Sequence, residues 1–176
     1  MADHTFKPGN TMNSRAYDAL IKAIQLGDAA IVKRLKMLTP TVEQRDILHY
    51  AVQFGNSSIV SELLNSNWIN EINEFDDVSF TPLIWAARNN HKETVKLLLE
   101  AGANINGYDS ARIGNTVLRE VVGESDTELV KLLLSYGADP SIRGWMQMNA
   151  LDKAMERYKN SSTAESEKII QMLQQV

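Results

Sequence analysis

Residues 81–106 read TPLIWAARNNHKETVKLLLEAGANIN, and residues 116–141 read TVLREVVGESDTELVKLLLSYGADPS. The second stretch repeats the first at an offset of 35 residues, from Thr81 to Thr116. The shared positions include an opening threonine, a Val-x-x-Leu-Leu run and a Gly-Ala pair, all in one ungapped register. Self-similarity at a fixed period of this size indicates a repeat architecture.

The same register extends to both ends of the chain. Leu48, Ala51 and Leu63 precede their counterparts in the first stretch by 35 residues, and Leu20 and Ala23 begin a further copy. Near the C-terminus the pattern resumes at Asn149 and requires about six extra residues around positions 158–165. We therefore predict five units at about 14–38, 45–70, 79–106, 114–141 and 147–175, in one domain over 14–176 that follows a flexible segment, 1–13.

Each unit predicts two short helices. Leu83, Ala86 and Ala87 form the apolar side of a first helix, and Val95, Leu98 and Leu99 form one face of a second. Thr81 is expected to cap the first helix and Pro82 to occupy its first turn. Gly102 is expected to end the second helix, because the position after a helix often needs a left-handed backbone. One unit cannot bury its apolar face alone, so the units must stack as a solenoid.

The pattern resembles the ankyrin repeat, whose hallmark T-P-L-H-x-A stands here as Thr81-Pro82-Leu83-Ile84-Trp85-Ala86. The G-A-x-x-N that follows in the family is matched by residues 102–106. The resemblance implies an all-α repeat solenoid with short hairpin loops and a concave face. The motif histidine is kept at His49 but is Ile84 and Arg119 in later units. We predict that His49 bonds hairpin backbone, that His91 is a structural turn residue and that Trp85 is core.

Composition and motifs argue against several functions. The chain of 176 residues has no cysteine, which excludes disulfide frameworks, cysteine zinc sites and thiol catalysis. A formal charge of −4 argues against a general nucleic-acid binder. The three histidines are far apart, and no G-x-S-x-G or phosphate-binding glycine motif occurs. We predict no enzyme activity, no metal, no cofactor and no membrane span, and we expect a cytoplasmic monomer.

In the ankyrin family, partners usually meet the hairpin tips and the exposed side of the first helices. By this resemblance a protein partner is expected to bind through the concave face, and aromatic and arginine side chains there are typical of binding hot spots. The candidate contact residues are Phe54, Asp77, Val78, Phe80, Arg88, Asn89, Arg112, Ile113, Asn115, Glu124, Trp145, Met146 and Met148, with Arg45, Gln53, Arg157 and Tyr158 as further positions.

Several functions remain open at this point. A chain of this length without a second domain favours an adaptor or a stoichiometric inhibitor. An immunity protein that neutralises a toxin, or a secreted bacterial effector, is an alternative. The remaining alternative is an enzyme with a site beside the long fifth-unit loop, which would show a deep pocket and a carboxylate or histidine with a strongly shifted pKa.

Overall fold

The computed structural model describes residues 11–38, 47–66, 69, 71–112, 114–124 and 126–176. These residues form helices and turns and contain no β-strand. The helices are α1 Thr11–Leu26, α2 Ala29–Leu38, α3 Ile47–Gln53, α4 Ser57–Leu64, α5 Pro82–Arg88, α6 Lys92–Glu100, α7 Val117–Val121, α8 Thr127–Ser135, the 3₁₀ turn η1 Trp145–Gln147, α9 Ala150–Asn160 and α10 Ala164–Gln174.

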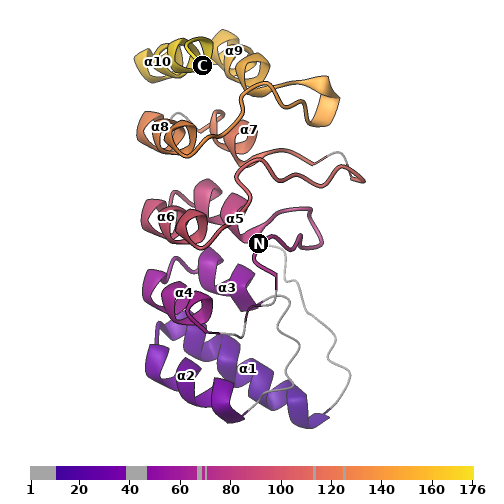
Figure 1. The fold of residues 1–176 in the computed structure, drawn as a ribbon, viewed down its shortest axis with the longest axis vertical. Helices are drawn as coiled ribbons and strands as arrows, with labels where there is room; N and C mark the ends of the chain where they lie inside the picture. Colours follow the sequence, from indigo (N-terminus) through magenta and orange to yellow (C-terminus); the bar gives the residue numbers. More distant parts are fainter. Residues whose placement is uncertain (1–10, 39–46, 67–68, 70, 113, 125) are drawn as a thin grey trace.

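The helices pair in chain order and stack in two layers (Figure 1). Each odd-numbered helix packs against the even-numbered helix that follows it, and α1, α3, α5, α7 and α9 contact one another in succession. The even-numbered helices form the second layer on the other side. This is the all-α repeat solenoid that the sequence predicts.

The core runs along the stack between the two layers. Val60, Val95 and Val130, which are 35 residues apart, are all fully buried, as are Leu63, Leu98 and Leu133. Burying a side chain of this size contributes about 1.5–3 kcal/mol. The repeated Val-x-x-Leu spacing therefore supplies part of the core that holds the stacked units together.

Local signals set the helix ends as predicted. The hydroxyl of Thr81 accepts a hydrogen bond from the N–H of Ile84 at 3.3 Å, and Pro82 occupies the first turn of α5. Thr116 accepts in the same way from Arg119 at the start of α7. After α6, Gly102 has a φ of +92°, which a residue without Cβ adopts at little cost.

The first and last units show how the ends of the described chain are built. Helix α1 begins at Thr11, within the segment predicted to be flexible, and residues 1–10 lie outside the described part of the chain. In the fifth unit, α9 has 11 residues whereas α7 has 5. The extra residues of that unit thus lengthen its first helix, and the two-helix plan is kept.

Candidate interaction surface

The loops that precede α5, α7 and α9 all project on one side of the stack, next to the first-helix layer (Figure 1). They are the α4–α5 loop (65–81), the α6–α7 loop (101–116) and the α8–α9 loop (136–149). We call this side the loop face. Most of the residues predicted to bind a partner lie on it.

Hydrogen bonds join each loop to the next. The hydroxyl of Ser79 donates to Oδ2 of Asp109 at 2.9 Å, and Nη1 of Arg112 donates to the carbonyl of Asp77 at 3.0 Å. Farther along, the N–H of Asp139 donates to Oδ1 of Asn106 at 2.8 Å. Because these bonds connect neighbouring loops, the loop face is one continuous surface.

One of these bonds predicts a pH effect. The Ser79 hydroxyl lowers the pKa of Asp109 below its ordinary value of 3.8, helped by the N–H groups of Arg112 and Ala111 and by the Arg112 charge, while partial burial opposes them. Because the folded-state pKa is lowered, the loop-to-loop contribution is fully present above pH 3.8 and is lost as the pH falls through the lower value. We expect Ser79→Ala to raise the pKa of Asp109 toward 3.8, as followed by carboxyl NMR titration. An unchanged pKa would contradict this assignment.

Asp76 organises the α4–α5 loop from within. Its Oδ1 accepts from the N–H groups of Val78 at 3.0 Å and Phe80 at 2.9 Å, and its Oδ2 accepts from Nε1 of Trp85 at 2.6 Å. Trp85 is half-buried: it packs against the core, and its indole N–H is bonded to the loop. The prediction that Trp85 is a core residue is therefore correct only in part. Asp76 thus has a structural role in the loop.

Phe80 is a packed residue and does not lie at a solvated tip. Its ring meets that of Trp85 edge-on, with centroids 5.4 Å apart, and the guanidinium of Arg88 lies 4.9 Å from its centroid. Its carbonyl lies 3.1 Å from Nε2 of His49, which confirms the predicted structural role of that histidine. Phe80 therefore helps to stabilise the loop, and its role as a partner-binding residue stays a prediction.

This packing predicts a measurable difference between two neighbouring residues. Phe80→Ser is expected to lower the free energy of unfolding by about 2 kcal/mol, less than the loss for a fully buried phenylalanine. Val78→Ser, at a side chain that is 51% exposed in the same loop, is expected to change it by less than about 0.5 kcal/mol. Urea denaturation of both variants measures the two values. Equal stabilities would show that the Phe80 ring makes no net contribution.

A chain of polar contacts crosses the first helices between the loops. Nη1 of Arg88 lies 2.6 Å from Oε2 of Glu120, and Oε1 of Glu120 accepts from Nδ2 of Asn115 at 2.5 Å. Oδ1 of Asn115 accepts from Nη1 of Arg119. The second nitrogen, Nη2 of Arg119, donates to the carbonyl of Trp145 at 2.8 Å. The contacts thus run from α5 through α7 to the α8–α9 loop.

Arg119 is a buried cation, only 4% exposed, at the position of the motif histidine. Burial lowers its pKa, and the charges of Glu120 and Glu156 oppose that effect. The departure from histidine is visible in the sequence, but the contacts of Arg119 and Glu120 were not predicted from it. An arginine at the position of the motif histidine could have indicated such contacts, because a buried charge must find hydrogen-bond partners.

The candidate contact residues differ in where they lie and in how exposed they are. Val78, Arg112, Trp145 and Met146 project from the loops with exposed side chains, and Asp77 and Arg88 lie beside them. The structure does not place Phe54, Asn89 and Glu124 with them: these exposed residues lie in the turns that follow α3, α5 and α7. Asn115 and Met148 are half-buried, and Ile113 and Arg45 lie outside the described residues.

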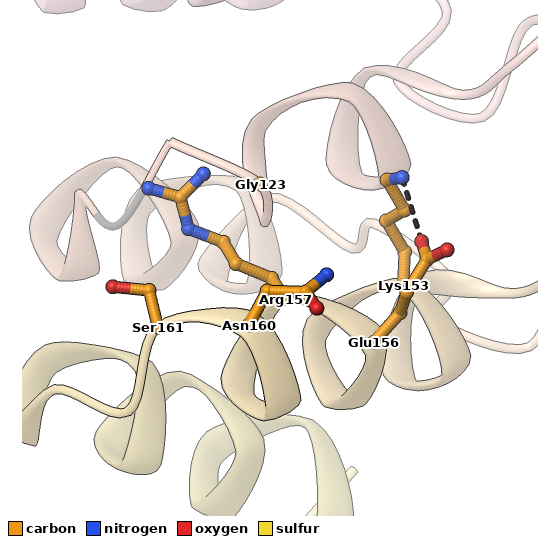
Figure 2. Close-up of a pocket in the computed structure, with 6 residues that line it drawn as sticks. All are labelled: Gly123, Lys153, Glu156, Arg157, Asn160 and Ser161. Atoms are coloured by element: carbon orange, nitrogen blue, oxygen red, sulfur yellow. Dashed lines mark hydrogen bonds and ion pairs between the residues drawn. The ribbon is translucent and has the colours of Figure 1, made fainter.

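A hollow of about 360 Å³ lies beside α9, where the fifth-unit enzyme site was considered (Figure 2). It is lined by Gly123, Lys153, Glu156, Arg157, Asn160 and Ser161. Nζ of Lys153 lies 2.8 Å from Oε2 of Glu156, and this bond lowers the pKa of the carboxyl group. A general acid at neutral pH needs the opposite shift, so the hollow does not favour the enzyme alternative.

In the part of the chain that the structure describes, no group of three or more histidine, aspartate or glutamate side chains is arranged to hold a metal ion. Within the same residues, no helix has the length and apolar character needed to cross a bilayer.

Comparison with known proteins agrees with the repeat pattern. The family profile described as "Ankyrin repeats (3 copies)" matches residues 20–109, and that described as "Ankyrin repeat" matches residues 113–145. Among curated proteins, the chain is 32% identical over 117 residues to "Ankyrin repeat and SAM domain-containing protein 6" of Mus musculus, covering 66% of this chain and 13% of that protein. It is 34% identical over 93 residues to "Palmitoyltransferase Hip14" of Drosophila melanogaster, covering 53% of this chain and 14% of that protein.

A third relative is "Ankyrin repeat, SAM and basic leucine zipper domain-containing protein 1" of Carollia perspicillata, which is 36% identical over 115 residues, covering 62% of this chain and 23% of that protein. The chain therefore spans less than a quarter of the length of each of these relatives. What they share with it is the repeat region.

Proposed function

Because the chain belongs to the ankyrin repeat family, whose stacks are protein–protein interaction modules, we propose that it binds a partner protein through the loop face and acts without catalysis. The observation that carries the proposal is the exposed set of side chains on that face, Val78, Arg112, Trp145 and Met146. Loops joined by hydrogen bonds lose little freedom on binding, so the surface suits docking with little rearrangement.

We propose that the chain is an adaptor or a stoichiometric inhibitor, because a preformed binding face blocks or recruits a partner without any chemistry of its own. We also propose that it acts as a monomer in the cytoplasm. The exposed polar residues of the last unit favour a monomer, because they leave that end of the stack solvated: Lys159, Asn160, Glu165, Glu167 and Lys168.

Affinity capture from the native cell lysate tests the choice of face. The bait would be compared with a quadruple variant, Val78→Ser, Arg112→Ala, Trp145→Ala and Met146→Ser, which changes exposed residues of the loop face. A matched control, Lys96→Ala, Glu100→Ala and Lys131→Ala, changes exposed residues of α6 and α8 in the second layer. We expect a protein that is captured by the unmodified chain and the control but lost with the quadruple variant. Loss with the control alone would place the contact on the second helices.

A further inference from the structure

The α8–α9 loop presents two large apolar side chains on a strained backbone. Trp145 is 58% and Met146 is 64% exposed. Met146 and Gln147 have φ values of +60° and +57°, in the left-handed region that costs an L-residue roughly 1–2 kcal/mol each. Strain of this kind persists only where the surroundings fix it, and it gathers at functional sites.

The surroundings that fix this turn are visible. The N–H of Trp145 donates to Oδ1 of Asn115 at 3.1 Å, and its carbonyl accepts from Nη2 of buried Arg119 at 2.8 Å. At the base of the turn, Gly144 approaches Asn115 so closely that an added Cβ would lie 2.5 Å from Oδ1. Contacts with Asn115 and Arg119 thus fix the backbone of the turn, while the side chains of Trp145 and Met146 remain exposed.

We propose that the turn formed by residues 144–148 is a preformed apolar anchor that inserts into an apolar pocket on a folded partner protein, and that Arg119 is its positioning residue. This proposal rests on the proposed interaction function and specifies the kind of partner. A projecting turn is convex, so it fits a concave pocket and cannot enclose an extended peptide. Because the left-handed backbone is already formed, its cost does not reduce the binding affinity.

The charge beside the anchor specifies the rim of the pocket. Arg143 has a side chain that is 58% exposed, and its Nη1 donates to the carbonyl of Gln147 at 2.5 Å. Residues 140–149 contain no acidic side chain, and the ion pair between Arg143 and Asp152 is long, at 3.9 Å. We therefore expect a carboxylate on the partner at the edge of the pocket.

Arg119 acts through Trp145 and does not touch the partner. The equivalent residues in the two preceding units, at intervals of 35 residues, are His49 and Ile84. His49 contacts the carbonyl of Phe80 in the next loop, whereas the isoleucine side chain has no hydrogen-bond donor. Arg119 joins its own loop, through Asn115, to the loop that follows. This double contact is why the anchor depends on it.

The positioning role is tested on the full chain alone, by amide hydrogen exchange. The N–H groups of Gln147 and Met148 bond to the carbonyls of Gly144 and Trp145, and in Arg119→Met we expect them to exchange at least about tenfold faster, while the amides of α8 keep their protection. Arg112→Met, at an exposed arginine of the neighbouring loop, should leave them unchanged. Unchanged exchange in Arg119→Met would overturn the role, and Arg119→Gln takes its place if the methionine variant does not fold.

Photocross-linking in the native cells tests the class of partner. The photoreactive residue p-benzoylphenylalanine is placed in turn at positions 146, 53 and 96. Mass spectrometry then identifies the partner residues that each position reaches. We expect position 146 to reach apolar residues inside a folded domain, with a yield that Arg119→Met lowers at least about fivefold, and position 96 to reach nothing. Cross-links to a disordered segment overturn the anchor. If position 53 on the first helix α3 reaches a partner and 146 does not, the interaction function stands and the anchor fails. If neither reaches one, both fail.

Discussion

Replacing Gly55 by alanine is expected to lower the free energy of unfolding by about 3 kcal/mol, because two separate costs fall on one methyl group. Gly55 ends the turn after α3 with a φ of +70°, where an L-residue loses about 1–2 kcal/mol. A Cβ there would lie 2.5 Å from Cε1 and 2.7 Å from Nε2 of His91 in the next unit. Forcing such a contact costs about 1–3 kcal/mol more.

Two variants separate these costs. Gly102 has a φ of +92°, and a Cβ added there would meet no atom within 4 Å. Gly102→Ala should therefore lower the free energy of unfolding only by the backbone cost, about 1–2 kcal/mol. Gly55→Ala combined with His91→Ala should recover most of the steric part relative to Gly55→Ala. Chemical denaturation followed by circular dichroism gives all the values. If Gly55→Ala and Gly102→Ala lose the same amount, the His91 ring moves aside freely and the steric argument is wrong.

The sequence predicted these helices because the signals that form them are local or periodic. Val95 and Leu98 face the core through their spacing alone, and Thr81 caps α5 through a residue only three positions away. His91 was predicted to be a structural turn residue, but its ring lying against Gly55 joins residues 36 positions apart. The spacing of residues within one unit does not predict contacts between side chains of neighbouring units, such as that of the His91 ring with Gly55.

The candidate surface was less predictable for the same reason. Phe80 and Val78 are two positions apart and both apolar, yet one packs on Trp85 and the other is exposed. Asp76 fixes the backbone of both residues by accepting from their N–H groups, and that contact depends on the shape of the loop. Met146 was recognised as a candidate by its residue type, but its left-handed backbone follows from contacts with other loops.

Replacing Asn115 by alanine is expected to lower the free energy of unfolding by about 2 kcal/mol, and by more than replacement of its charged partner Arg119. Oδ1 of Asn115 accepts from Nη1 of Arg119 and from the N–H of Trp145, and its Nδ2 donates to Glu120. Without the amide, the guanidinium stays buried with its Nε already unbonded and keeps the carbonyl of Trp145 as its hydrogen-bond acceptor. A buried charge that loses one of its few partners costs more than a neutral side chain of similar size.

The double variant distinguishes this account from a loss of packing. Arg119→Met removes the buried charge and fills most of the same space, so by itself it should change stability by less than about 1 kcal/mol. In the background of Arg119→Met, Asn115→Ala should then cost only about 0.5–1 kcal/mol, because no stranded guanidinium remains. Urea denaturation of the two single variants and the double variant gives the coupling free energy. Strictly additive losses would mean that Asn115 stabilises the loop by itself and that Arg119 does not depend on it.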